Sequence, residues 1–187
     1  MANICDNQYR FVFGNEEKAK RFLDFINKDA SVYELGVAAK IDGAEKRDVR
    51  ESIYHAEIDK NTVNVYTESK WTPCPNAWRD IARTFDDGVE AFYEAEEPGC
   101  VIFASNDPRF VGKYVYDFWN VPEGLKACHC DETGIADKEG LIKVLQAALG
   151  TKTQDLEDLL LLMIEKGFAD DFSVHEIKYR PIEDWDE

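Results

Sequence analysis

Apolar and polar residues alternate in short runs over much of the chain, and this period of two predicts β-strands. The runs cover residues 4–13, 52–58, 62–69, 89–96, 100–105 and 112–121. Asp59-Lys60-Asn61 separates the second run from the third, which predicts a β-hairpin. A last run, at 172–179, predicts one more strand at a sheet edge.

Four other segments space their apolar residues three or four apart, as amphipathic helices do. They cover residues 16–29, 76–85, 137–149 and 153–167. Asn15 precedes the first segment as an N-cap residue, and Gly150 follows the third as a C-terminal cap. Residues 30–51 have neither period, so we expect a short strand or extended segment at SVYELG and a loop after it.

The order β-α-β-β-α-β, followed by more strand and two helices, is typical of a split βαβ arrangement. It predicts an α+β, ferredoxin-like fold whose antiparallel sheet carries both early helices on one face. We expect residues 1–120 to form this domain. Residues 121–187 should form a loop, a helical hairpin and an acidic tail that pack on it.

A run of aromatic, proline and glycine residues lies in the middle of the chain. Lys70-Trp71 is followed by Pro73 and Pro75, then Trp78 and Phe85 on the predicted helix, then Tyr93, Glu96-Glu97-Pro98-Gly99 and Phe103. Asn3, Cys5, Asn7 and the strand-helix unit at 9–29 add to the pattern. With these residues the first two thirds of the chain resembles the YubB-like ferredoxin-like domain family of plasmids and phages.

The resemblance implies a ferredoxin-like fold and a mobile-element origin, and it supplies no catalytic residues. The same motifs have structural explanations. Pro98-Gly99 predicts a tight turn, and Trp71 and Trp78 are expected to cover one end of the sheet as buried aromatics.

The formal net charge of -16 over 187 residues argues against direct binding to nucleic acid. It suits a protein partner with a basic surface, or it serves solubility alone. No apolar run approaches the ~20 residues of a membrane span, and MANICDNQYR lacks the pattern of a secretory signal. Five cysteines, an odd number, favour free thiols in the cytoplasm.

Carboxylates and aromatic residues share one parity on two predicted strands. These candidate binding residues are Tyr66 and Glu68 on one strand and Glu90, Phe92, Glu94 and Glu96 on another. Spaced carboxylates among aromatic rings could imitate a nucleic-acid backbone for a basic host protein, as an inhibitor of host defence would. The alternative is that the helices at 137–167 cover the sheet and that the carboxylates are ordinary surface.

Two groups of residues favour an enzyme or a metal-binding protein instead. His55 and Glu57 share a strand face, and carboxylates of the strand at 90–96 beside them would permit acid–base chemistry. Cys128-His129-Cys130 is the one cluster of soft metal ligands, but a structural zinc site needs four ligands and the sequence shows no second pair. We therefore expect no metal site, no cofactor and no catalytic residues.

Overall fold

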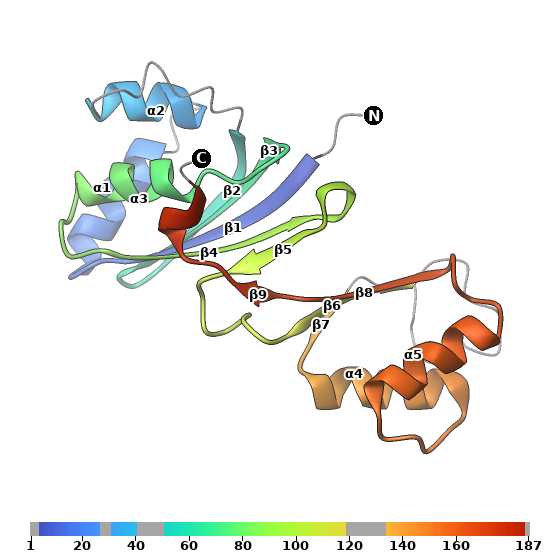
Figure 1. Cartoon of the computed structure of the whole chain (residues 1–187). Helices are drawn as coiled ribbons and strands as arrows, with labels where there is room; N and C mark the ends of the chain where they lie inside the picture. Colours follow the sequence, from blue (N-terminus) through green and yellow to red (C-terminus); the bar gives the residue numbers. More distant parts are fainter. Residues whose placement is uncertain (1–3, 27–30, 41–50, 119–133, 186–187) are drawn as a thin grey trace. The chain divides into compact units, whose positions relative to one another are not determined.

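The structure, a computed structural model, describes residues 4–26, 31–40, 51–118 and 134–185. It is a mixed α+β protein with antiparallel sheets, as the sequence predicts. The chain divides into two compact units (Figure 1). Unit 1 comprises Met1–Arg109 and Tyr179–Glu187, and unit 2 comprises Phe110–Lys178.

Unit 1 is built on a six-stranded sheet with the order β2-β3-β1-β4-β5-β9. Its elements are β1 (Ile4–Val12), α1 (Glu16–Ile26), α2 (Val32–Ala38), β2 (Glu51–Asp59), β3 (Thr62–Lys70), α3 (Pro75–Arg83), β4 (Glu90–Glu97), the 3-10 turn η2 (Pro98–Cys100), β5 (Ile102–Ser105), β9 (Lys178–Tyr179) and the 3-10 turn η4 (Ile182–Trp185). β1 pairs with both β3 and β4, and the predicted hairpin of β2 and β3 is confirmed.

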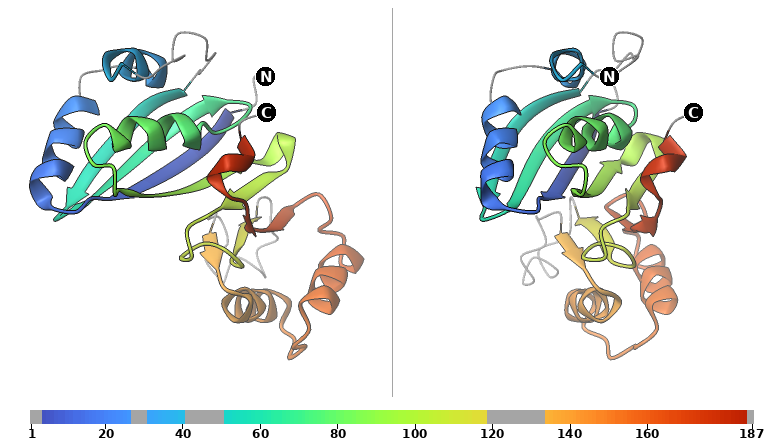
Figure 2. Two further views of the ribbon diagram at one scale, coloured as in Figure 1. Left: turned by 60° about the vertical axis from the view of Figure 1, so that its left-hand side comes forward. Right: turned by 90° about the vertical axis from the view of Figure 1, so that its left-hand side faces the viewer.

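Helices α1 and α3 pack against one face of this sheet (Figure 2). On β1 this helix-covered face carries Cys5, Asn7, Tyr9 and Phe11, all buried. The core is aromatic: the Phe11 and Phe22 ring centroids are 5.1 Å apart, and those of Tyr9 and Trp78 are 5.4 Å apart. The intervening residues of β1, among them Asp6, Gln8 and Arg10, lie on the opposite face because side chains alternate along a strand.

The helix ends follow the capping rules. The Asn15 side chain accepts a hydrogen bond from the Lys18 backbone N–H (3.0 Å) at the start of α1. Pro75 opens α3 at a position where its missing N–H costs nothing. These local signals explain why both helices were predictable.

Unit 2 contains a three-stranded sheet with the order β7-β6-β8. Its elements are β6 (Tyr114–Phe118), β7 (Gly134–Ala136), α4 (Lys138–Leu149), α5 (Leu156–Glu165) and β8 (Phe172–Glu176). The two helices share one apolar cluster, in which Leu141, Leu145, Leu159 and Met163 are buried with Phe118 of β6. Gly150 ends α4 with a left-handed backbone (φ 63°), as its position in the sequence predicts.

Three expectations of local structure are wrong. SVYELG belongs to helix α2, which starts with a capping box between Ser31 and Glu34. The run at 172–179 forms two strands, β8 and β9, which belong to different sheets. Trp71 is 57% exposed and has a φ of 79°, because it follows β3 in a turn that directs it away from the core that Trp78 fills.

Candidate functional site

Three carboxylates line up across neighbouring strands on the opposite face of the six-stranded sheet. Asp6 of β1 pairs in register with Glu68 of β3 on one side and with Glu96 of β4 on the other. Directly paired residues of antiparallel strands have Cβ atoms about 4.5–5.5 Å apart. Glu68, Asp6 and Glu96 therefore form one continuous acidic row.

All six candidate binding residues lie on this face, but they do not form one site. Gln8 is the next residue of β1 on this face after Asp6, and its cross-strand neighbours are Tyr66 and Glu94. Phe92 is opposite Arg10, and Glu90 is opposite Val12. With a rise of about 3.3 Å per residue, Glu90 stands roughly 20 Å from Glu96. Their role in binding stays a prediction, and Glu90 is remote from the acidic row.

Glu94 differs from the solvated carboxylate that the sequence suggested, since its exposed fraction is only 7%. Burial raises the pKa of its carboxyl well above the usual value, and the charge of Glu96, a hydrogen bond to Glu96 and the charge of Asp6 raise it further. Its Oε1 has no hydrogen-bond partner within the described part of the chain. Glu94 is thus a buried carboxyl at the edge of the acidic row, surrounded by other acids.

Aromatic side chains of β2 and β3 stand beside the acidic row. The pairing of β2 with β3 shifts between Ile53 and His55, and Tyr54 is the additional residue of this bulge. Its ring centroid is 6.3 Å from that of Tyr66, and its side chain is 60% exposed. The pKa of Tyr54 is raised by partial burial and by the charges of Asp6, Glu68 and Glu94.

Another part of the same face is neutralised within the protein. The Arg10 Nε and Arg109 Nη2 atoms lie 2.8 Å from Oδ2 of the buried Asp107. Burial alone would raise the pKa of Asp107, but the hydrogen bonds from both arginines lower it overall. The Arg10 guanidinium also lies over the Phe92 ring, 4.0 Å from its centroid. The Phe92 ring is therefore already covered by Arg10 of the same protein.

The geometry does not assemble the acid–base group around His55 and Glu57. The His55 Nε2 and Glu57 Oε2 atoms are 3.8 Å apart on an exposed part of β2. Strands β3 and β1 separate β2 from β4, so Glu90, Glu94 and Glu96 are at least about 14 Å away and not beside His55. Cys128, His129 and Cys130 lie outside the described residues. Over the ranges described, no group of three His, Cys, Asp or Glu side chains could hold a metal ion.

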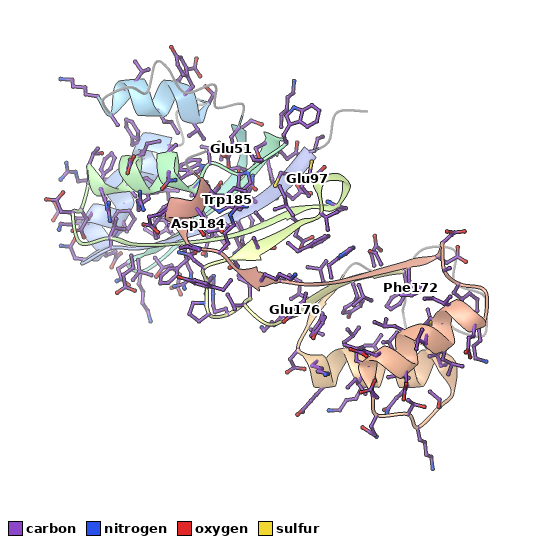
Figure 3. All side chains as sticks on the ribbon, viewed as in Figure 1. Glu51, Glu97, Phe172, Glu176, Asp184 and Trp185 are labelled. Atoms are coloured by element: carbon purple, nitrogen blue, oxygen red, sulfur yellow. The ribbon has the colours of Figure 1, made fainter. Side chains whose placement is uncertain are left out.

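A second polar cluster, which we call the Glu51 cluster, lies on the helix-covered face. Glu51 opens β2 and is labelled in Figure 3. Its exposed fraction is 1%. Its Oε1 accepts hydrogen bonds from Asn7 Nδ2 (3.3 Å), Trp78 Nε1 (3.2 Å) and the Thr67 hydroxyl. Burial raises the pKa of Glu51, while hydrogen bonds from Thr67, Tyr9, Trp78 and Cys74 partly offset the rise.

The Glu51 cluster gathers residues that the sequence placed in separate motifs. Cys5 donates from Sγ to Asn7 Oδ1 (3.1 Å), and Asn7 Nδ2 donates to Ser69 Oγ (3.0 Å). Glu97, also buried, accepts a hydrogen bond from the Cys100 backbone N–H across the predicted Pro98-Gly99 turn. The sequence does not predict that Glu51 is buried, because the period of apolar residues identifies buried apolar positions and not a buried carboxylate.

Searches of protein-family models, curated proteins and solved structures found no match to this chain. Within the described residues, no helix is both long and apolar enough to cross a membrane. Functional interpretation therefore depends on the geometry of the chain itself.

Proposed function

We propose that this protein is a non-enzymatic binding protein whose acidic row contacts a basic surface of a protein partner. The observation that carries the proposal is the register of Glu68, Asp6 and Glu96 on three adjacent strands. Rows of like charge across a sheet destabilise the fold unless a counter-charge arrives. Such a row has a physical reason to exist if a cationic partner covers it.

The ferredoxin-like fold is part of the same proposal. The strand order β2-β3-β1-β4 with antiparallel pairing supports it, as do α1 and α3 on one face. In this interpretation the opposite face of the sheet is the functional one. Helix α1 follows β1 and helix α3 follows β3, as in a split βαβ unit.

The biological setting follows from the resemblance to the YubB-like family. A plasmid or phage protein with a net charge of -16 would suit inhibition of a host defence protein by imitating nucleic acid. Spaced carboxylates would occupy the groove that otherwise holds phosphates. Among the described residues, Cys5, Cys74 and Cys100 form no disulfide, and we place the protein in the cytoplasm on the cysteine count of the sequence.

The test compares two double variants with the same change in charge. Asp6→Asn/Glu68→Gln removes charge from the acidic row, whereas Asp24→Asn/Glu17→Gln removes it from exposed positions of helix α1, outside the row. Each protein, immobilised, is exposed to bacterial lysate, and retained proteins are identified and then purified. We expect a partner that the wild type and the control variant retain and the row variant loses.

Binding of the purified partner should weaken steeply with added salt, since exposed charges are screened over about 8–10 Å at physiological ionic strength. Equal retention by the row variant, or an affinity that salt does not change, would contradict the proposal. An apolar contact surface would then be the better interpretation.

A further inference from the structure

The opposite face of the sheet shows how this protein holds an arginine of its own. Arg10 makes a 2.8 Å contact to the carboxylate of Asp107, and its guanidinium lies 4.0 Å from the centroid of the Phe92 ring. One carboxylate and one aromatic ring are sufficient to fix the planar group. Both interactions are favourable for a guanidinium, which stacks on rings and pairs with carboxylates at the same time.

The acidic row presents the same two chemical groups. Asp6 and Glu68 supply carboxylates in adjacent strands, and Tyr54 supplies an exposed ring that packs against Tyr66, two residues before Glu68 on the same face of β3. In the part of the chain that the structure describes, no ion pair joins Asp6 or Glu68 to a cation of the protein. Burial and the charge of Glu57 raise the pKa of Tyr66, and the charge of Arg109 opposes this rise. Arg109 is already paired with Asp107.

A buried oxygen beside the row points independently to a missing donor. Glu94 is more than nine-tenths buried, yet its Oε1 finds no hydrogen-bond donor among the described residues. Glu94 lies two residues before Glu96 on the same face of β4, opposite Gln8 of β1, so it stands next to the row. A buried polar atom without a partner costs about 1–3 kcal/mol, which a donor from outside would offset.

We propose that the acidic row and Tyr54 form a binding site for an arginine side chain of the protein partner. The inference depends on the proposed function and specifies which cation the row selects. The guanidinium would pair with Asp6 and Glu68, stack on Tyr54 and direct a further N–H toward Glu94. A guanidinium has five N–H donors in a plane, whereas a lysine ammonium is a point charge and stacks less well.

Hexa-arginine and hexa-lysine peptides are suitable probes because they carry the same charge. Their affinities for the full chain are measured by calorimetry at low ionic strength, with backbone NMR shifts to locate the contact. The proteins compared are the wild type, Asp6→Asn/Glu68→Gln, the control Asp24→Asn/Glu17→Gln, and Tyr54→Leu. Tyr54 is exposed, so its replacement should leave the fold intact, which the NMR spectrum verifies.

We expect hexa-arginine to bind roughly two- to fivefold more tightly than hexa-lysine, the range that cation–π contacts give at exposed sites. Tyr54→Leu should abolish this preference, and the row variant should weaken both peptides more than the control variant does. Equal affinities in the wild type, or a preference that survives Tyr54→Leu, would overturn the arginine site and leave the proposed function standing. If the row and control variants bind both peptides alike, the acidic row is no binding site and both proposals fail.

Discussion

Glu51 and Glu94 are two buried glutamates on opposite faces of the same sheet, and they differ in their neighbours. Each has one carboxyl oxygen without a hydrogen-bond partner in the described residues. Around Glu51 the neighbours are donors, from Asn7, Thr67 and Trp78. Around Glu94 they are other acids, Glu96 and Asp6.

The comparison shows that burial alone does not determine whether a carboxylate stabilises the fold. Donors around Glu51 compensate its desolvation and tie β1, β2, β3 and α3 together. The acids around Glu94 make its ionised form less favourable, so Glu94 does not stabilise the fold as Glu51 does. We infer that the Glu51 cluster serves the fold, whereas Glu94 contributes little to holding it together.

The largest expected effect concerns Trp78, the donor from α3 to Glu51. Trp78 is 0% exposed and its ring packs on Tyr9 and Phe11. Trp78→Ala should reduce the free energy of unfolding by about 3–5 kcal/mol. The matched control, Trp71→Ala, should change it by only about 0.5 kcal/mol because Trp71 is mostly exposed. Urea unfolding measures both, and equal midpoints would contradict the assignment of Trp78 to the core.

The next effect concerns Glu51 itself. Glu51→Ala leaves the donors of Asn7, Thr67 and Trp78 without their shared acceptor and should cost about 3 kcal/mol. Glu51→Gln keeps an oxygen at the Oε1 position and removes the buried charge, so its cost should be much smaller. Unfolding curves of the two variants decide the point. If Gln were as damaging as Ala, the charge of Glu51 would matter more than its role as acceptor.

Much of unit 1 was predictable because its signals are local. The β2–β3 hairpin follows from two alternating runs and a turn, and α3 follows from Pro75 and its apolar stripe. Helix α2 was missed although its signal is present, since Ser31 and Glu34 have the spacing of a capping box. A seven-residue helix offers too few turns for its periodicity to show.

The features missed in the candidate site depend on partners that are distant in sequence. The burial of Glu94 depends on the strands paired on either side of it, where Gln8 and Ser105 are its cross-strand neighbours. The position of Tyr54 depends on a bulge, which shifts the strand alternation by one residue. Asp6 was overlooked as a member of the row because only the register places it between Glu68 and Glu96.

The smallest expected effect tests the Glu94 side of the comparison through pH. A carboxyl whose pKa is higher in the folded protein binds more protons there than in the unfolded chain. The free energy of unfolding should therefore fall as pH rises from about 4.5, the ordinary value for Glu94, up to its raised pKa. Glu51 gives the same sign, whereas the lowered pKa of Asp107 makes stability fall below about pH 3.8.

Glu94→Gln should flatten the part of this pH profile above 4.5 and raise stability at neutral pH by roughly 1 kcal/mol, the size typical of a single substitution. Glu90→Gln, at an exposed position of the same strand, is the control for the loss of one carboxylate. Urea unfolding at intervals from pH 4 to pH 8 provides the measurement. If Glu94→Gln kept the wild-type slope, Glu94 would not be the group whose raised pKa causes the slope. The proposed difference between Glu94 and Glu51 would then be wrong.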